Sequence, residues 1–317
     1  MLISDKQELR RCVKQAVRRA QVSETMLCFD VQQGEMGVEP LMASLRQGQG
    51  TPFGTDGAAV YAALDALELP ARDRASAVSM QQSYERNAWL REVLDVMRAQ
   101  RVLVAVPLER AQDFLPSDDR FAALPVVDSA CFVPGRYGVD YRAAAARIAE
   151  AAHACGARDL LVRGVSEDAL RYAVLPACED ARCVLHAMLE GEEQVRTFAV
   201  LLDECSAVRA VVSAKGEAER ALIALAASRP RLLVRLTDMS HLPLALEALG
   251  TRLLPYASEA HLPELMLGRW IGARERLWPL LADAYLPLAR AGYQLDSQRI
   301  ERDVAALLTE NLKAMYA

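Results

Sequence analysis

The stretch that decides the fold is RCVLHAMLEGEEQVRTFAVLLDECSAVRAVVSA, residues Arg182–Ala214. It begins and ends with short apolar runs, and the segment between them is rich in Glu, Leu, Ala and Arg. The short runs are typical of strands, and the longer segment is typical of a helix that covers them. Because the apolar residues are nearly continuous rather than alternating, we expect strands that are buried on both faces, as in a parallel sheet.

The same unit repeats along the chain and predicts an α/β fold, a closed (β/α)8 TIM-type barrel. Eight strands are predicted: Thr25–Asp30, Arg101–Pro107, Ala123–Ala130, Arg158–Gly164, Arg182–Met188, Val208–Ala214, Arg231–Thr237 and Thr251–Ala257. Helices are predicted between the later strands, over 141–156, 167–178, 192–205, 216–230 and 241–250. Eight such units in 317 residues favour the barrel, and an open doubly wound sheet is the alternative.

Two segments depart from the repeat. Residues 31–100 are too many for one crossover and predict a helical insertion after the first strand. This insertion holds the Gly-rich stretch 46–60, in which residues 48–57 are predicted as a flexible connection. Residues 261–317 lack a strand and predict extra C-terminal helices, with Gly292 as a stop signal and Asp296 or Ser297 as an N-cap. An apolar stripe at helical spacing predicts a core-facing helix in this segment: Leu262, Leu265, Met266, Trp270, Leu277, Leu281 and Tyr285.

Composition excludes several classes of protein. With 37 basic and 42 acidic residues, the net charge is -5, so we expect no broad positive surface and no nucleic-acid partner. The N-terminal residues lack the apolar core of a signal peptide, and no stretch has the length of apolar sequence that spans a bilayer, so we expect no membrane partner. The seven cysteines are scattered without a C-x-x-C pair. These features predict a cytoplasmic protein with reduced, mostly buried thiols.

In a (β/α)8 barrel the carboxyl ends of the strands share one mouth, so polar residues at those ends are the candidates for a site. In chain order they are Asp30, Gln32, Asp128, Arg163, His186, Ser213, Lys215, Thr237, Asp238, Ser258 and Glu259. Each also has a structural explanation: Asp238 can cap the next helix, Lys215 can be solvated, and His186 can be a satisfied histidine of the barrel core. The chain has no His-x-His, His-Glu-x-x-His or Gly-x-Ser-x-Gly pattern, so neither an imidazole-based metal site nor a serine nucleophile is predicted.

Four segments form a recognisable series of motifs: DDRFAALPVVD (118–128), LPYASEAHLPELMLGRW (254–270), LADAYLPLARAGYQL (281–295) and IERDVAALLTENL (300–312). Together they resemble the uronate isomerase family of the amidohydrolase superfamily. The resemblance is strongest near the C-terminus, where the motifs are specific in order and spacing. It implies one amidohydrolase-like barrel domain over residues 1–317 and, in the family, metal-dependent interconversion of aldose and ketose uronates such as glucuronate.

The family's metal ligands are not retained at the matching positions. The family's first strand carries Asp-x-His-x-His, whereas this chain reads DVQQG from Asp30, with Gln32 and Gly34 in the two histidine places. At the eighth strand, Ala257 stands in the place of a histidine and Glu259 in the place of an aspartate. Because Gln is a weak neutral donor and Gly has no side chain, we predict no metal and no cofactor. The alternative is a divalent metal held by Asp30, Gln32 and Glu259.

Three functions stay open at this point. The first is a diverged uronate isomerase-like protein, a pseudoenzyme without the metal-dependent reaction, that binds a small anionic sugar or metabolite at the barrel mouth. The second is an active uronate isomerase or a related sugar-acid isomerase or lyase with an altered site. The third is a non-catalytic assembly or regulatory protein that forms a homo-oligomer through its C-terminal helices. The catalytic or binding candidates are Glu259, Asp238, His186 and Arg163.

Overall fold

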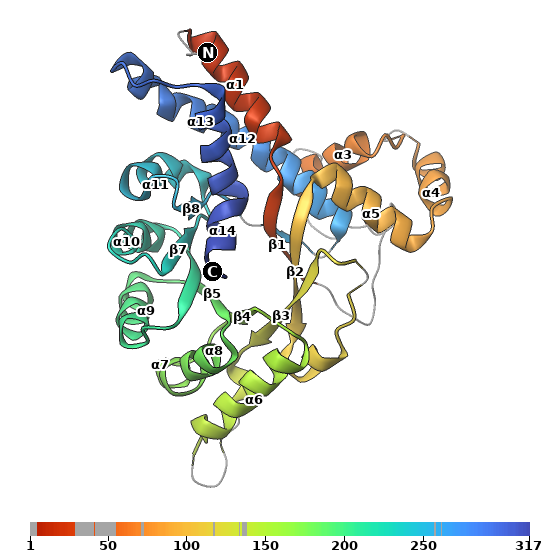
Figure 1. Ribbon diagram of the computed structural model, residues 1–317. Helices are drawn as coiled ribbons and strands as arrows, with labels where there is room; N and C mark the ends of the chain where they lie inside the picture. Colours follow the sequence, from red (N-terminus) through yellow and green to blue (C-terminus); the bar gives the residue numbers. More distant parts are fainter. Residues whose placement is uncertain are drawn as a thin grey trace. The chain divides into compact units, whose positions relative to one another are not determined.

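The computed structural model (Figure 1) describes residues 5–28, 41, 55–70, 73–116, 118–132, 134, 138–256, 258–260 and 262–317. The chain divides into two compact units. The first unit comprises residues 1–103, 117–121 and 258–309, and the second comprises 104–116, 122–257 and 310–317. Each unit is described below by itself.

The strands follow the order β8-β7-β6-β5-β4-β3-β2-β1-β9. Their bounds are β1 Val22–Cys28, β2 Ala99–Pro107, β3 Phe121–Val127, β4 Asp159–Val162, β5 Val184–Leu189, β6 Arg209–Ala214, β7 Leu232–Arg235, β8 Leu253–Leu254 and β9 Glu259–Ala260. Neighbouring strands from β3 to β8 pair in parallel. The eighth predicted strand contains β8, which pairs with β7. The short β9 follows the predicted end of this strand and pairs with β1, and both pairings are parallel. This sequential order with helical crossovers is that of the (β/α)8 TIM-type barrel, which confirms the predicted fold class.

In the second unit, helices cover one face of the strands and the C-terminal segment covers the other. Figure 1 shows α9, α10 and α11 on one side of β5 to β8 and α14 on the opposite side. Every residue of β4 and β7 is buried, as the continuous apolar runs predicted. On the inner face the strands and the C-terminal segment form one apolar cluster: Val184, Val211, Leu233, Leu254, Leu312 and Met315.

The predicted helices of the second unit are present. Their bounds are α6 Tyr141–Ala154, α7 Glu167–Ala169, α8 Leu175–Ala181, α9 Glu192–Glu204, α10 Glu217–Ala226, α11 Leu242–Leu249 and α14 Asn311–Ala314. The segment predicted as one helix over 167–178 contains a π-helical turn at Leu170–Val174. Pro176 lies in the first turn of α8 and has no backbone N–H, which accounts for the break in the regular hydrogen-bond ladder.

The helices of the first unit confirm the insertion and the C-terminal helices. Their bounds are α1 Lys6–Arg19, α3 Thr55–Ala66, α4 Arg74–Gln82, α5 Arg86–Met97, α12 Pro263–Arg290 and α13 Ser297–Ala305. The predicted flexible connection needs correction. Residues 48–54 lie outside the described residues, but Thr55–Gly57 form the start of α3. Alanine follows Gly57, and the high helix propensity of this run outweighs the cost of one glycine.

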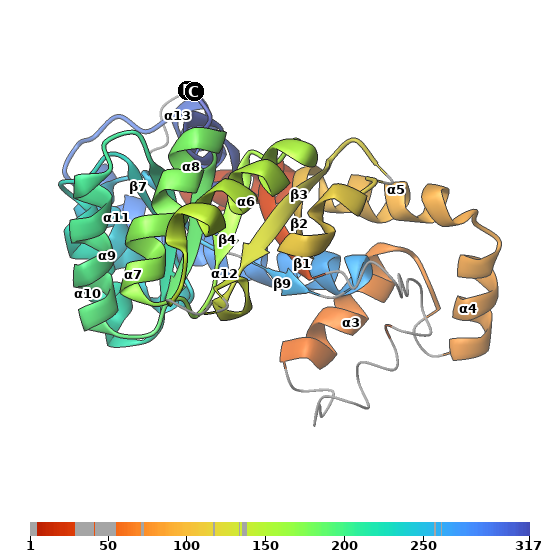
Figure 2. The same cartoon turned by 90° about the horizontal axis from the view of Figure 1, so that it is seen from below.

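Helix α12 forms the core of the first unit. It packs against α1, α3 and α5, and Figure 2 shows it running beside α3. All seven residues of the predicted stripe are buried, which confirms the core-facing interpretation. Gly292 adopts a φ of 84° just after the helix, and the Asp296 carboxylate accepts the backbone N–H of Arg299 at 2.7 Å. The predicted stop and N-cap are therefore confirmed.

Two further expectations concern the thiols and the membrane. The six cysteines whose side chains are described are free thiols, and burial raises the pKa of each above its usual value, to about 12 for Cys183. The thiol form is therefore favoured near neutral pH. Among the described helices, none is both long enough and apolar enough to cross a membrane.

Gly268 should be indispensable for the packing of α12 on α3. A Cβ atom at Gly268 would overlap the backbone carbonyl of Ala59 in α3. We expect Gly268→Ala to lower the free energy of unfolding by about 3 kcal/mol, because backbone atoms cannot move aside as a side chain can. Gly272→Ala in the same helix is the matched control, since nothing lies within 4 Å of its Cβ position. Urea denaturation measures both, and equal midpoints for the two variants would contradict the packing argument.

Candidate functional site

Three of the four catalytic or binding candidates lie in the second unit, two of them after the ends of strands and one within a strand. Arg163 follows β4 and is exposed. Asp238 is also exposed, and its carboxylate accepts the backbone N–H and the hydroxyl of Ser240 at 2.8 and 2.7 Å. Asp238 therefore caps the short helical turn before α11, as its structural explanation proposed. The third candidate, His186, is fully buried in β5.

Of the other strand-end candidates, some lie wholly or partly outside the described residues. Asp30 and Gln32 lie outside the described residues. Glu259 belongs to the first unit, where its backbone pairs with Met26 of β1. Lys215 follows β6 and is exposed, with its ammonium 3.4 Å from a carboxylate oxygen of Glu190. An exposed pair at this distance contributes little to stability, in agreement with a solvated lysine.

His186 is held from both sides by charged residues. Its Nε2 lies 2.8 Å from Oδ1 of Asp159, and its Nδ1 lies 2.8 Å from Nη2 of Arg235. A guanidinium can only donate, so Nδ1 must be the acceptor. Nε2 therefore carries the hydrogen and donates it to the Asp159 carboxylate. The imidazole is neutral in this arrangement and separates one positive charge from one negative charge.

The C-terminal segment completes this arrangement. The Tyr316 hydroxyl donates to Oδ1 of Asp159 at 2.7 Å, and the Arg158 guanidinium lies 4.7 Å from the centre of the Tyr316 ring. Asp159 and His186 are 0% exposed and Arg235 is 4% exposed. We call Arg235–His186–Asp159–Tyr316 the polar chain. Buried charges are tolerated when they are paired and hydrogen-bonded; here the Asp159 carboxylate accepts two hydrogen bonds, and the Arg235 guanidinium donates one to His186.

Sequence reasoning found only one member of the polar chain. Asp159 and Arg235 stand inside the apolar runs RDLLVRG and RLLVRLT, where the prediction treated them as parts of strands. A charged residue within a run that is buried on both faces was the available signal, because such a charge requires a buried partner.

A second polar cluster joins the ends of β6 and β7. Glu219, in the first turn of α10, is fully buried. Its Oε1 accepts the backbone N–H of Thr237 and lies 2.9 Å from the Thr237 hydroxyl, while its Oε2 lies 2.6 Å from Nδ1 of His241. Thr237 was predicted as a candidate, but Glu219 and His241 were not.

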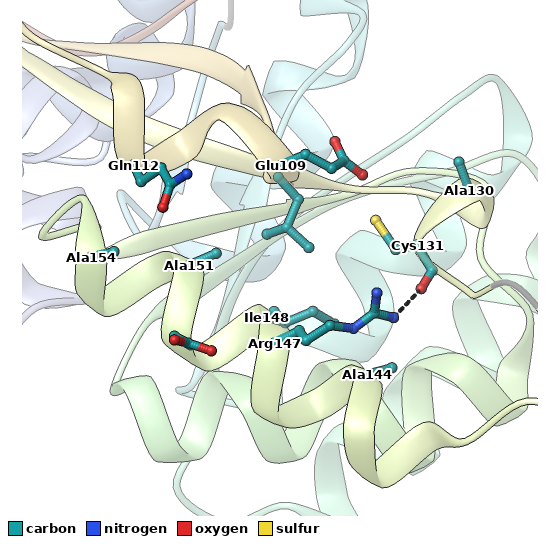
Figure 3. A pocket seen from close by; sticks show the side chains of 11 residues that line it. Glu109, Gln112, Ala130, Cys131, Ala144, Arg147, Ile148, Ala151 and Ala154 are labelled. Carbon is teal, nitrogen blue, oxygen red and sulfur yellow. Dashed lines mark hydrogen bonds between the residues drawn. The ribbon is translucent and has the colours of Figure 1, made fainter.

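The structure also contains a surface cavity of about 310 Å³ in the second unit (Figure 3). It is lined by α6 and by the 3-10 turns Leu108–Asp113 and Ser129–Cys131, which follow β2 and β3. The Arg147 guanidinium extends toward the second turn and donates to the Cys131 carbonyl at 3.0 Å. Asp128, another predicted candidate, is not among the lining residues; it caps the turn by accepting the Ala130 N–H at 2.9 Å.

The described donor set does not fit the metal centre that the resemblance implies. Within the described residues, no group of three or more His, Cys, Asp or Glu side chains is placed to hold a metal ion. His186 is hydrogen-bonded to Asp159 and His241 to Glu219, and His153 is exposed on α6. His261 lies outside the described residues. We therefore derive no chemical step through a metal.

The strand order and the placement of polar groups at strand ends define the class of structure as a (β/α)8 barrel. Among solved structures, the uronate isomerase of Bacillus halodurans C-125 superimposes with a TM-score of 0.83 at 16% identity, over 99% of this chain and 97% of that chain. The glucuronate isomerase of Caulobacter crescentus gives 0.57 at 12% identity, over 99% and 95%. The uronate isomerase of Thermotoga maritima gives 0.55 at 10% identity, over 100% and 98%. The chain therefore has the fold of the uronate isomerases.

Two further comparisons give no match. No protein-family model matches the sequence, and no curated protein sequence matches it. At 10–16% identity the likeness to the isomerases is one of fold, so the chemistry has to be argued from the residues of this chain.

The polar chain predicts unequal costs for two conservative substitutions. Asp159→Asn retains the shape but removes the negative charge that faces Arg235 across His186, so we expect a loss of about 3 kcal/mol in the free energy of unfolding. Tyr316→Phe removes one hydroxyl from the same carboxylate and should cost about 1 kcal/mol. Urea denaturation of both variants measures the difference. A cost for Asp159→Asn no greater than that for Tyr316→Phe would contradict the assigned charges.

Proposed function

We propose that this protein is a diverged uronate isomerase-like barrel that binds a small carboxylate-bearing sugar or metabolite at the carboxyl ends of its strands. In this proposal it does not carry out the metal-dependent aldose–ketose isomerisation. The observation that carries the proposal is the polar chain, because it holds in a fixed position the guanidinium of Arg235, the last residue of β7.

Arg235 is suited to a carboxylate ligand. A guanidinium presents five N–H donors in a planar fork that matches the two oxygens of a carboxylate, and His186 accepts from one Nη2 atom. The neutral imidazole spaces Asp159 away from the guanidinium. In the polar chain, His186 therefore stands between the guanidinium of Arg235 and the carboxylate of Asp159 and helps to orient the guanidinium.

Neighbouring strands add positive charge at the same ends. Arg163 follows β4 and Lys215 follows β6, and both are exposed. Together with Arg235 of β7, they put a cation at the carboxyl end of three of the four successive strands β4 to β7. Cations gathered at one rim raise the local concentration of anions, which supports an anionic ligand over a neutral one.

The absence of the parent reaction is inferred from the residues that would have to perform it. Isomerisation moves a proton between adjacent carbons and requires a base and an electrophile for the carbonyl oxygen. In the uronate isomerase family the first strand carries two metal-binding histidines. The resemblance matches these two positions to Gln32 and Gly34 of this chain. The imidazoles of His186 and His241 are engaged with Asp159, Arg235 and Glu219. These features support a binding role rather than the metal-dependent reaction.

Calorimetric titration with D-glucuronate and D-galacturonate tests the binding half of the proposal. We expect heat with at least one acid and none with D-glucose or D-galactose, which lack the carboxylate. Arg163→Gln should weaken binding about tenfold, because a charge-assisted hydrogen bond contributes about 1.5 kcal/mol or more. Arg196→Gln, an exposed position on the outer helix α9, is the control and should bind as the parent does. No heat with either acid would refute the binding role.

An isomerase assay with added divalent metals tests the other half. We expect no turnover of either uronate, and elemental mass spectrometry of the purified protein should show no stoichiometric metal. The physical reason is the lack of imidazole donors at the matching positions Gln32 and Gly34. Turnover accompanied by a bound metal would instead support the active isomerase, with Asp30 and Glu259 as the first ligands to substitute.

A further inference from the structure

We propose that Glu219 and His241 form a carboxylate–imidazole dyad that recognises a hydroxyl group of the ligand through Nε2 of His241. The ligand class rests on the proposed function: with a carboxylate bound by the cations and a hydroxyl bound by the dyad, it is a polyhydroxylated acid. The dyad itself rests on geometry that is independent of any ligand.

The dyad has a defined tautomer. Glu219 Oε2 lies 2.6 Å from Nδ1 of His241, and a carboxylate can only accept, so Nδ1 carries the hydrogen. In the neutral imidazole Nε2 is then an acceptor with no hydrogen of its own. Thr237 orients the carboxylate through its backbone N–H and its hydroxyl, which both approach Oε1. A carboxylate that fixes the tautomer of a histidine is the arrangement by which proteins direct the second nitrogen toward a ligand.

Exposure distinguishes the two members of the dyad. The Glu219 side chain is 0% exposed, whereas that of His241 is 13% exposed. Solvent therefore reaches the imidazole but not the carboxylate. Among the described residues, none forms a hydrogen bond with Nε2. Within the described part of the chain, Nε2 of His241 is therefore available as a hydrogen-bond acceptor.

The position of the dyad agrees with a role at the mouth. Glu219 lies just after β6, and His241 lies in the turn between β7 and α11. Lys215 directly follows β6 and Arg235 is the last residue of β7, and both are among the cations assigned to the ligand carboxylate. In barrels of this type the loops after the strands carry the residues that contact ligands.

The alternative is that Glu219 and His241 have only a structural role and hold α10 against the turn between β7 and α11. One substitution separates the two roles. An asparagine at position 241 places its amide nitrogen near the place of Nδ1, so it retains the donor to Glu219, but it has nothing in the place of Nε2. A structural tie should therefore survive His241→Asn, whereas recognition through Nε2 should not.

The test combines thermal unfolding with titration of D-glucuronate and D-galacturonate into the parent protein and His241→Asn. We expect an unchanged unfolding midpoint and binding that is weaker by about tenfold, the effect of losing one hydrogen bond to a positioned group. His153→Asn, exposed on α6, is the matched control and should change neither. Equal affinity of His241→Asn and the parent overturns the inference and leaves the proposed function intact.

A second measurement tests the dyad without a ligand. Nitrogen-15 NMR of the histidine side chains distinguishes a protonated ring nitrogen from an unprotonated one. Neutral His241 should carry its hydrogen on Nδ1, and Glu219→Gln should allow the other tautomer to appear. A hydrogen on Nε2 in the parent protein overturns the dyad. If the parent binds neither acid, the proposed function and the ligand assigned to the dyad both fail, and the NMR result still judges the tautomer.

Discussion

The buried charges of the polar chain impose a constraint on the whole second unit. Arg235 and Asp159 come from strands β7 and β4, which are separated by β5 and β6 in the strand order, and His186 of β5 joins them at 2.8 Å on each side. A buried charge without a partner costs several kcal/mol, so the register of these strands and the position of the C-terminal segment have to satisfy the same chain. Tyr316 also packs against the apolar cluster that includes Val184 and Leu312, so the C-terminal segment contributes to both the polar chain and the apolar core.

The same constraint connects fold to site. Arg235 stands at the carboxyl end of its strand, whereas Asp159 begins its own strand, so the polar chain runs along the inner face from one end of the strands toward the other. Tyr316, next to the last residue of the chain, donates to the same carboxylate. The proposed cation is therefore positioned by residues that also hold the C-terminal segment in place. Such a charge belongs to the core of the strands, so its position does not depend on a metal centre.

Much of the fold could be predicted from the sequence, and the reasons are local. All eight strands appear where continuous apolar runs stand, and the stripe of α12 is buried at every predicted position. The Gly-rich stretch was misjudged in part, because the helix propensity of the alanines that follow Gly57 outweighs the glycine. The site was less accessible to prediction. Asp238 reads equally as a cap and as a site residue, and Glu219 lies in an ordinary helical segment with no local sign that it is buried beside His241. Such partners are brought together by the tertiary fold alone.

His186 and His241 show that the hydrogen-bond partners of a histidine, rather than the residue type, determine its role. His186 and His241 both make a contact of 2.6 to 2.8 Å at Nδ1. At His186 the partner is a guanidinium, so Nδ1 accepts and Nε2 donates inward to a buried carboxylate. At His241 the partner is a carboxylate, so Nδ1 donates and Nε2 becomes the acceptor of a side chain that solvent reaches. In the first arrangement both ring nitrogens of His186 are hydrogen-bonded in the core, so His186 is a positioning residue for Arg235. The second leaves a directed acceptor after the strand ends, which is why a structural role is assigned to His186 in β5 and a recognition role is proposed for His241 after β7.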